Sequence, residues 1–530
     1  MNMYLTSYEF VLFVMICFIL YYLLPKKCQW VILLVASYVF YFLSGAFYPL
    51  VLFTTSIVTY CTGMMVYRKS QTDSKWLEEN KDSITREEKK KFKADSAKIQ
   101  KRYMIAGVLL CLLILGVFKY TNFVIENINS ILGLVGKTNE LDAFDILLPM
   151  GLSFYTFQSI SYVVDIYRGK IEPQKNLLKY MLFVSFFPQL IQGPISRYSQ
   201  VEESLYKEHE FNTNIISHGL KRIIWGFFKK LVVADTIATA VLCISEDVEY
   251  YTGAWVLVGI VFYAIQLYAD FSGGIDITIG VAGLFGVCLP ENFNKPYFSK
   301  NIAEFWRRWH ITMGTWFKDY VFYPISISPS MNKVTKKCKN LFGRGVAKRV
   351  PVYVATIVTW FATGLWHGAS WNFVIWGLMN GIVLLVSQEL EPLYRKFHDA
   401  FPKLTGSKIY GGFEILRTFL LMGCINMLDY CQDVVVYFKQ LISMFLNFDL
   451  SALTGSEFID LGLSGYQYGV ILVGVAVMFI ASLLDNMKIK FNKCPYVVSY
   501  ALYLALFVAV ILFGAYGYGF DANQFIYNQF

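Results

Sequence analysis

Charged residues are scarce in this chain. Only 16% of its 530 residues are Asp, Glu, Lys or Arg, whereas 56% are hydrophobic and 18% are aromatic. A soluble protein usually carries about 25% charged residues. Apolar runs long enough to cross a membrane recur from one end of the chain to the other. We therefore expect an all-α, multi-pass protein that forms one integral membrane domain over residues 1–530.

Clustered metal ligands are also lacking. The ten cysteines are scattered, and the closest pair, Cys424 and Cys431, does not have metal-ligand spacing. The sequence therefore indicates neither a metal site nor a disulfide framework. No basic segment precedes the first apolar run, residues 8–24, and Lys26 and Lys27 follow it directly. This charge order argues against a cleavable signal peptide and places the N-terminus outside.

The net charge of +9 does not require a nucleic-acid partner, because most of the basic excess lies in loops between apolar runs. Residues 68–102 contain 12 basic and 7 acidic residues, and residues 333–349 contain seven basic and no acidic ones. The positive-inside rule places both loops in the cytoplasm. The first is either a solvated charged loop or a regulatory site. Within residues 497–530, the same rule places the tail that follows the final helix outside.

Several apolar segments are interrupted, so the number of crossings is smaller than the number of segments. Proline and glycine break the segments 146–164 and 177–198, which predicts broken or re-entrant helices. Residues 215–233 carry two pairs of basic residues between apolar ones, which favours an interfacial helix. We expect about twelve crossings.

Only five histidines are present, and one of them lies in an unusual aromatic stretch, residues 304–320. There Trp306 and Trp309 precede His310, and Gly314 follows one turn later. If the stretch is a single helix, it leaves a small notch beside the imidazole that can admit a substrate.

A second histidine, His367, stands between Trp366 and Gly368, with Trp371 nearby. It lies within residues 352–387, which contain no Asp, Glu, Lys or Arg and are long enough for two crossings that meet near Gly368. An ionisable group in a membrane is costly and is a functional candidate by default. The alternative for each histidine alone is a hydrogen-bonded packing residue. Together with the 304–320 stretch, this hairpin defines a predicted catalytic core over residues 304–387.

Two carboxylates, Asp270 and Asp276, flank a Gly-Gly pair that we expect to be flexible, in an otherwise apolar region. Buried carboxylates need partners. Each of them either caps a helix, pairs with Arg307 or Arg308, or takes a direct part in catalysis.

A neutral imidazole can take a proton from a hydroxyl as that hydroxyl attacks an acyl carbon. A nucleophile elbow of the Gly-x-Ser-x-Gly kind is not evident, so direct transfer from an activated donor is simpler than a serine acyl-enzyme. The two histidines therefore favour acyl transfer.

The two histidine strings resemble the membrane-bound O-acyltransferase family, in its alginate O-acetyltransferase branch. Four further motifs occur in the order seen in that branch: Phe187-Pro188, Gly193-Pro194-Ile195, Asp270-Phe271-Ser272-Gly273 and Asn292-Phe293-Asn294-Lys295-Pro296-Tyr297. The resemblance covers nearly the whole chain. Within residues 418–430 the chain departs from the branch, because Asn426-Met427-Leu428-Asp429-Tyr430 replaces an aromatic pair followed by Arg. This departure concerns the acceptor more than the chemistry.

The resemblance implies a tunnelled helical fold with His367 as the catalytic histidine and His310 as a second functional residue. It implies that Trp306, Arg307, Trp309, Asp270, Trp366 and Trp371 line or support the tunnel. The donor would be acetyl-coenzyme A or another acyl thioester from the cytoplasm, with no bound cofactor. The acceptor would be a hydroxyl of an envelope polysaccharide, or an extracytoplasmic esterase-like acyltransferase, at the bacterial plasma membrane.

Two other functions remain open. One is D-alanyl transfer to teichoic acid from a carrier-protein thioester, and the other is a lipid or glycan transporter, which would also have broken helices.

The C-terminal segment, residues 525–530, resembles the F-x-Y-x-x-F ending of the same branch. It suggests that Tyr527 accepts the acyl group first and passes it on, as covalent relays do. The alternative is a packing anchor at the membrane interface.

Overall fold

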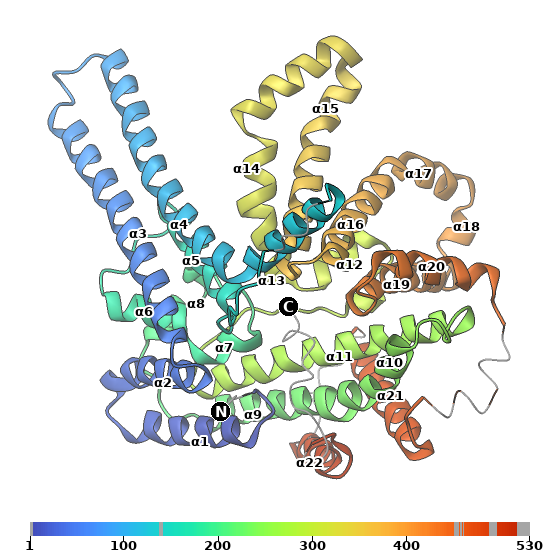
Figure 1. Cartoon of the computed structure of the whole chain (residues 1–530). Coiled ribbons are helices and arrows are strands. Elements are labelled where there is room, and N and C mark those ends of the chain that lie inside the picture. Colours follow the sequence, from blue (N-terminus) through green and yellow to red (C-terminus); the bar gives the residue numbers. More distant parts are fainter. Residues whose placement is uncertain are drawn as a thin grey trace. The chain divides into compact units, whose positions relative to one another are not determined.

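The computed structural model describes residues 4–136, 141–449, 455, 458, 461–486 and 496–516. These residues form helices and connecting segments without a strand (Figure 1). The all-α prediction is therefore confirmed for the described part of the chain. Two compact units are distinguished, one formed by residues 1–219 and 281–290 and the other by residues 220–280 and 291–530.

The first unit contains α1 (Tyr8–Leu23), α2 (Gln29–Ser44), α3 (Tyr48–Glu79), α4 (Arg86–Leu134), α5 (Leu152–Tyr167), α6 (Leu177–Ser185), α7 (Phe187–Gln192) and α8 (Tyr198–Tyr206). Two further helices have residues in both units, α9 (Thr213–Phe227) and α11 (Ala254–Leu284). The second unit continues with the π-helical η2 (Phe228–Ala234), α10 (Asp235–Glu246), α12 (Ile302–Arg308), α13 (Ile311–Phe317), η4 (Lys318–Phe322), α14 (Tyr323–Ser326), α15 (Pro329–His367), α16 (Trp371–Glu389), α17 (Glu391–Ala400), α18 (Pro402–Thr405), α19 (Lys408–Tyr430), α20 (Val434–Leu446), α21 (Gly465–Asn486) and α22 (Tyr496–Phe513).

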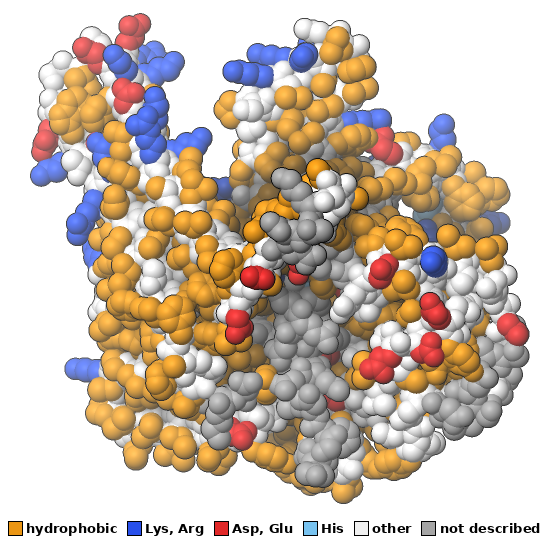
Figure 2. All heavy atoms as spheres, in the orientation of Figure 1, with side chains coloured by type: hydrophobic (Ala, Val, Ile, Leu, Met, Phe, Trp, Pro, Cys, Tyr) orange, Lys and Arg blue, Asp and Glu red, His pale blue; other side chains and the backbone are white. Residues whose placement is uncertain are grey.

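Within the described residues, seven helices are long and apolar enough to cross a membrane. They are Lys26–Ser44, Tyr48–Glu79, Arg86–Leu134, Ala254–Leu284, Trp371–Glu389, Lys408–Tyr430 and Gly465–Leu484, and four shorter apolar helices accompany them. Figure 2 shows the matching surface, in which hydrophobic side chains predominate. The protein is therefore a multi-pass membrane protein, while the count of twelve crossings stays a prediction.

Both segments expected as cytoplasmic loops are largely helical. Residues 68–102 form the end of α3, a short turn and the start of α4, which Thr85 and Glu88 cap reciprocally. Residues 333–349 belong to α15, which bends at Gly343 with a φ of 82°. In Figure 2 the Lys and Arg side chains gather near the ends of these two helical projections. The charged run 87–91 favours a surface helix in the first segment, and it lies in the first turns of α4.

The breaks predicted in the first unit are present. Gly151, with a φ of 68°, precedes α5, and a Cβ there would lie 2.2 Å from the Leu190 carbonyl oxygen. Only glycine fits both the backbone conformation and the close approach. A second break, at Phe186, separates α6 from α7.

In the second unit, residues of α11, α16, α19 and α20 pack into one hydrophobic core. The Gly-Gly pair expected to be flexible lies inside the continuous helix α11. A Cβ on Gly273 would lie 2.9 Å from the Gly226 carbonyl oxygen, so the glycine allows α9 and α11 to cross closely. Similarly, a Cβ on Gly364 would lie 2.3 Å from the Phe373 carbonyl oxygen. Glycine therefore serves helix packing at both places.

Candidate active site

His310 does not lie within a helix, which corrects the prediction of one helix through residues 304–320. The helix α12 ends at Arg308, Trp309 is extended, and His310 has φ 43° and ψ 54° in the left-handed region. A non-glycine residue in this region is strained by roughly 1–3 kcal/mol. Gly314 still follows one turn later, since its N–H donates to the His310 carbonyl oxygen at 3.1 Å.

The side chain of His310 is fully buried, and Asn292 holds it. The Asn292 Oδ1 atom lies 3.1 Å from His310 Nδ1, 3.1 Å from the Thr312 backbone nitrogen and 2.9 Å from Thr312 Oγ1. The backbone nitrogen of Thr312 can only donate, so the atom that faces it must be the amide oxygen of Asn292. His310 Nδ1 must then donate to the same oxygen. In a neutral ring this leaves the lone pair on Nε2.

The electrostatic surroundings favour the neutral form of His310. Burial, together with the nearby imidazole of His367, lowers its pKa well below the ordinary value. The ring is therefore neutral near pH 7 and can accept a proton from a reacting group.

His367 is the last residue of α15, and the chain turns away at the extended residue Gly368. The helix α16 begins at Trp371, so the two helices meet near Gly368 as predicted. The imidazole of His367 is half-buried, and its ring centroid lies 4.5 Å from that of Trp376. Trp366 lies between the histidines, with centroid distances of 5.8 Å to His310 and 5.0 Å to His367. The structure thus brings the two predicted histidines together around Trp366.

Buried asparagines orient the surrounding tryptophans. Trp376 donates from Nε1 to Asn426 Oδ1 at 3.1 Å, and Trp306 donates from Nε1 to Asn380 Oδ1 at 3.2 Å. The two tryptophan rings contact each other edge to face at 5.6 Å. Asn426 belongs to the segment in which this chain departs from the alginate branch, so the departure reaches the residues around His367. Neither Asn426 nor Asn292 was identified as a site residue from the sequence.

A cavity of about 1140 Å³ lies near the histidines, although neither His310 nor His367 belongs to its lining. Its lining includes residues adjacent to both of them, namely Ile311, Met313 and Gly314 after His310 and Thr363 one turn before His367. Thr356 and Thr359 continue a polar line along α15. Four basic residues, Lys300, Arg307, Lys318 and Arg417, and two acidic ones, Glu391 and Glu414, also line it. The cavity therefore combines an apolar wall with an excess of basic groups that can attract an anion.

Among the predicted supporting residues, Trp306 and Arg307 line this cavity, and Trp366 contacts both histidines. Trp309 is buried and packs against Phe293 at 5.1 Å instead of lining the cavity. Trp371 is 57% exposed at the start of α16, outside the buried cluster. Tyr527 lies outside the described residues, and its role as an acyl relay stays a prediction.

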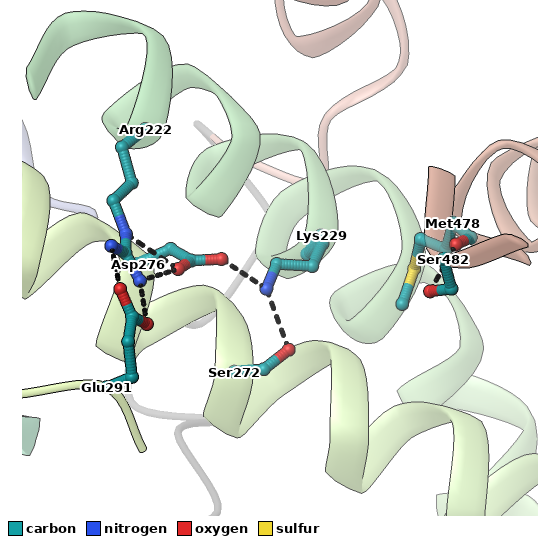
Figure 3. Close-up of polar contacts among 7 residues, drawn as sticks. All are labelled: Arg222, Lys229, Ser272, Asp276, Glu291, Met478 and Ser482. Carbon is teal, nitrogen blue, oxygen red and sulfur yellow. Dashed lines mark hydrogen bonds and ion pairs between the residues drawn. The ribbon is translucent and has the colours of Figure 1, made fainter. Parts of the chain in front are cut away.

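The partners predicted for the two aspartates were wrong. Asp270 Oδ1 lies 2.5 Å from Lys230 Nζ, and Lys230 also lies 2.6 Å from Asp235. Asp276 pairs with Lys229 and Arg222 at 2.5 and 2.9 Å (Figure 3). The prediction of an interfacial helix over residues 215–233 needs correction for the same reason, because Lys229 and Lys230 are buried in these pairs. The residue after Asp270, Phe271, contacts the His310 ring at 4.8 Å.

The fold and site define a multi-pass membrane protein with a histidine pair beside a large cavity. The model of the membrane-bound O-acyltransferase family matches residues 173–336 and 341–432. The probable alginate O-acetylase AlgI of Pseudomonas putida is 33% identical over 67% of its own length, so the chain belongs to this family, as its motifs indicated.

Three curated relatives illustrate the similarity. The probable alginate O-acetylase AlgI of Pseudomonas aeruginosa is 33% identical over 372 residues, which cover 70% of this chain and 63% of that protein. The peptidoglycan O-acetyltransferase of Helicobacter pylori is 34% identical, with 57% of this chain and 58% of the relative covered. The teichoic acid D-alanyltransferase of Bacillus subtilis is 28% identical over 47% of this chain and 61% of the relative. The chain thus spans less than two thirds of the length of these relatives.

Proposed function

We propose that the protein is an O-acyltransferase that moves an acyl group, specifically acetyl, across the bacterial plasma membrane onto a hydroxyl of an envelope polysaccharide. The single observation that carries the proposal is the convergence of His310 and His367 around Trp366 beside the cavity. The family membership and the names of the O-acetylating relatives support it.

His367 acts as the general base. It takes the proton of the acceptor hydroxyl as the oxygen attacks the carbonyl carbon of an acyl thioester. The carbon–sulfur bond then breaks, the ester is formed, and the proton passes to the departing thiolate. His310 is held neutral by burial and by Asn292, so its unprotonated Nε2 atom can accept a hydrogen bond from a reacting group.

The cavity holds the donor. Acetyl-coenzyme A or another phosphate-bearing thioester fits a cavity of this size whose basic residues attract phosphate groups. The acceptor is an envelope glycan, or an extracytoplasmic esterase-like acyltransferase that passes the group to one.

Acyl transfer by the purified protein tests this proposal. We expect His367→Ala to lose roughly 10²- to 10⁴-fold in activity and His310→Ala to be severely impaired, because a general base contributes about that much. His218→Ala is the control, since His218 is exposed on α9. Activity of His367→Ala within about tenfold of the wild type would show that the assignment is wrong. If the purified protein moved a lipid or glycan across a membrane without forming an ester, the result would favour a transporter.

A second candidate, D-alanyl transfer, is favoured by the similarity to the teichoic acid D-alanyltransferase. It would use a D-alanyl thioester on a carrier protein. Offering both donors to the same preparation separates the two candidates, because only one will acylate an acceptor in a His367-dependent way.

A further inference from the structure

We infer that Asn292 is a positioning residue that sets the tautomer of His310, and that ion pairs from Arg222 hold the segment that carries it. The inference rests on the proposed function, in which His310 acts at the reacting groups. It goes further by naming what makes that histidine ready to act.

The first support is the hydrogen bonding of Asn292. Its Oδ1 atom accepts from His310 and twice from Thr312, so the oxygen cannot rotate away without loss of all three bonds. A ring held in this way has its proton on Nδ1 and its lone pair on Nε2. Exchange of the two nitrogens would place two lone pairs against each other at 3.1 Å.

The second support is the backbone on both sides of His310. The Ile311 N–H donates to the Asn292 carbonyl oxygen at 2.9 Å, and the Asn294 N–H donates to the Arg308 carbonyl oxygen at 2.9 Å. These two bonds fasten the residues that flank His310 to the segment 292–294. Left-handed backbone at a bulky residue persists only where the surroundings over-determine it, and these bonds provide that constraint.

The third support is the attachment of this segment to the rest of the unit. Glu291, directly before Asn292, accepts two hydrogen bonds from Arg222 at 2.6 and 2.5 Å. Arg222 also donates from Nε to Asp276 at 3.0 Å, and Asp276 in turn pairs with Lys229. Figure 3 shows this chain of contacts, which joins α9, η2 and α11 to Glu291. A bidentate guanidinium–carboxylate pair fixes orientation as well as distance.

The shape of the Asn292 site suggests a sharp test. The Asn292 Nδ2 atom is buried and makes no hydrogen bond with any described residue. An aspartate therefore keeps the accepting oxygen and loses no hydrogen bond, whereas a leucine, whose side chain has the same number of heavy atoms, removes the acceptor. Asn292→Asp and Asn292→Leu thus separate hydrogen-bond acceptance from packing.

The test uses the full-length protein in detergent with ¹⁵N-labelled imidazoles. With five histidines in the chain, the spectrum of His310→Gln assigns the His310 signals. We expect the wild type and Asn292→Asp to show a protonated Nδ1 and an unprotonated Nε2, and Asn292→Leu to show a mixture of tautomers. In acyl transfer, we expect the kcat of Asn292→Leu to fall by roughly tenfold or more. This loss should be smaller than the loss caused by a missing general base. The KM for acetyl-coenzyme A should stay within about threefold.

The ion pairs from Arg222 that hold the segment 292–294 are tested with Glu291→Gln. The Glu291 side chain is 60% exposed, so the protein should tolerate this change. We expect a several-fold fall in kcat without a change in the melting temperature. The matched control is Glu210→Gln, which removes a carboxylate from the exposed pair with Lys26 in the other unit and should leave kcat unchanged.

A protonated Nε2 in wild-type His310, or an unchanged tautomer in Asn292→Leu, would overturn the inference. The tautomer is read without turnover, so an absence of acyl transfer in the wild type would refute the proposed function and leave the positioning of His310 standing.

Discussion

The cluster of Lys230, Asp235 and Asp270 offers a decisive test of whether Asp270 serves structure or chemistry. Lys230 Nζ lies 2.5 Å from Asp270 and 2.6 Å from Asp235, and the side chains of Lys230 and Asp270 are each 2% exposed. Lys230 is therefore an ion-pair partner of both carboxylates. Because Asp270 precedes Phe271, which touches His310, both interpretations place it close to the reaction.

Removal of either partner from a buried pair costs about 3–5 kcal/mol, because the remaining charge stays in the interior uncompensated. In Asp270→Asn, Lys230 keeps Asp235 as a counter-charge, so we expect a loss at or below the low end of this range. In Lys230→Met, two carboxylates lose their cation, so we expect a loss at the high end. The exposed counterpart Lys26→Met should cost less than about 1 kcal/mol.

The pH dependence of the stability of these variants provides a second, independent test. Burial raises the pKa of Asp235 to about 6, and removal of the lysine takes away the attraction that lowers this pKa. A carboxyl group whose pKa is higher in the folded state binds its proton more tightly there. Its protonation therefore stabilises the fold as the pH falls. The difference in the free energy of unfolding between Lys230→Met and the wild type should therefore become smaller as the pH falls from 8 to 5.

Thermal unfolding of the purified variants in detergent, followed by tryptophan fluorescence, measures these losses, and acyl transfer per folded molecule measures the chemistry. A structural role requires that Asp270→Asn unfold at a lower temperature while its folded fraction stays active. If Asp270→Asn instead kept its melting temperature and lost activity more than about 100-fold, Asp270 would take a direct part in catalysis. Equal stability of Lys230→Met and the wild type would refute the reasoning about the buried charge.

Three further predictions concern other parts of the chain. Gly364→Ala should lower the melting temperature and the activity, because its Cβ would meet the Phe373 backbone, whereas Gly345→Ala on the same helix meets nothing within 4 Å and should be tolerated; the same fluorescence assay measures both. Cysteines at the exposed positions 83 and 340, in a background without accessible native thiols, should resist membrane-impermeant reagents in intact cells, and labelling of either without permeabilisation would reverse the orientation. If Tyr527 relays the acyl group, mass spectrometry should find an adduct on the C-terminal peptide that disappears in Tyr527→Phe and His367→Ala, whereas full activity of Tyr527→Phe would leave only an anchor.

The sequence predicted the parts of the fold that depend on apolar length and on helix-breaking residues. The all-α class, the break at Pro149–Gly151 and the meeting of two helices near Gly368 are present as expected. These features are local, because a proline or glycine acts on its own stretch of backbone. The convergence of the two histidines was suggested by their shared Trp and Gly surroundings.

The partners of the buried charges could not be read from the sequence. Lys229 and Lys230 are adjacent in the π-helical η2, so their side chains leave it in different directions and reach different carboxylates of α11. Asp270 and Asp276 lie six residues apart on α11, about 120° apart around its axis, and match that spread. The helical periodicity is compatible with this pairing. Whether the aspartates pair with Lys229 and Lys230 or with Arg307 and Arg308, however, depends on how α9 and α11 cross at Gly226 and Gly273.

The break at His310 was missed for a related reason. The pattern of Trp306, Trp309 and His310 has helical spacing, and no proline or glycine interrupts it. The helix ends because Asn292, 18 residues before His310 in the sequence, supplies hydrogen bonds that a continuous helix would have supplied. The Asn292 carbonyl oxygen accepts from the Ile311 N–H, and its side-chain oxygen accepts from the Thr312 N–H. In a membrane protein an interrupted backbone is tolerated only where its polar groups are satisfied by other protein groups or by water. Asn292 both accepts hydrogen bonds from the interrupted backbone and orients the imidazole of His310. Selection for the backbone structure would therefore also maintain the orientation of the imidazole.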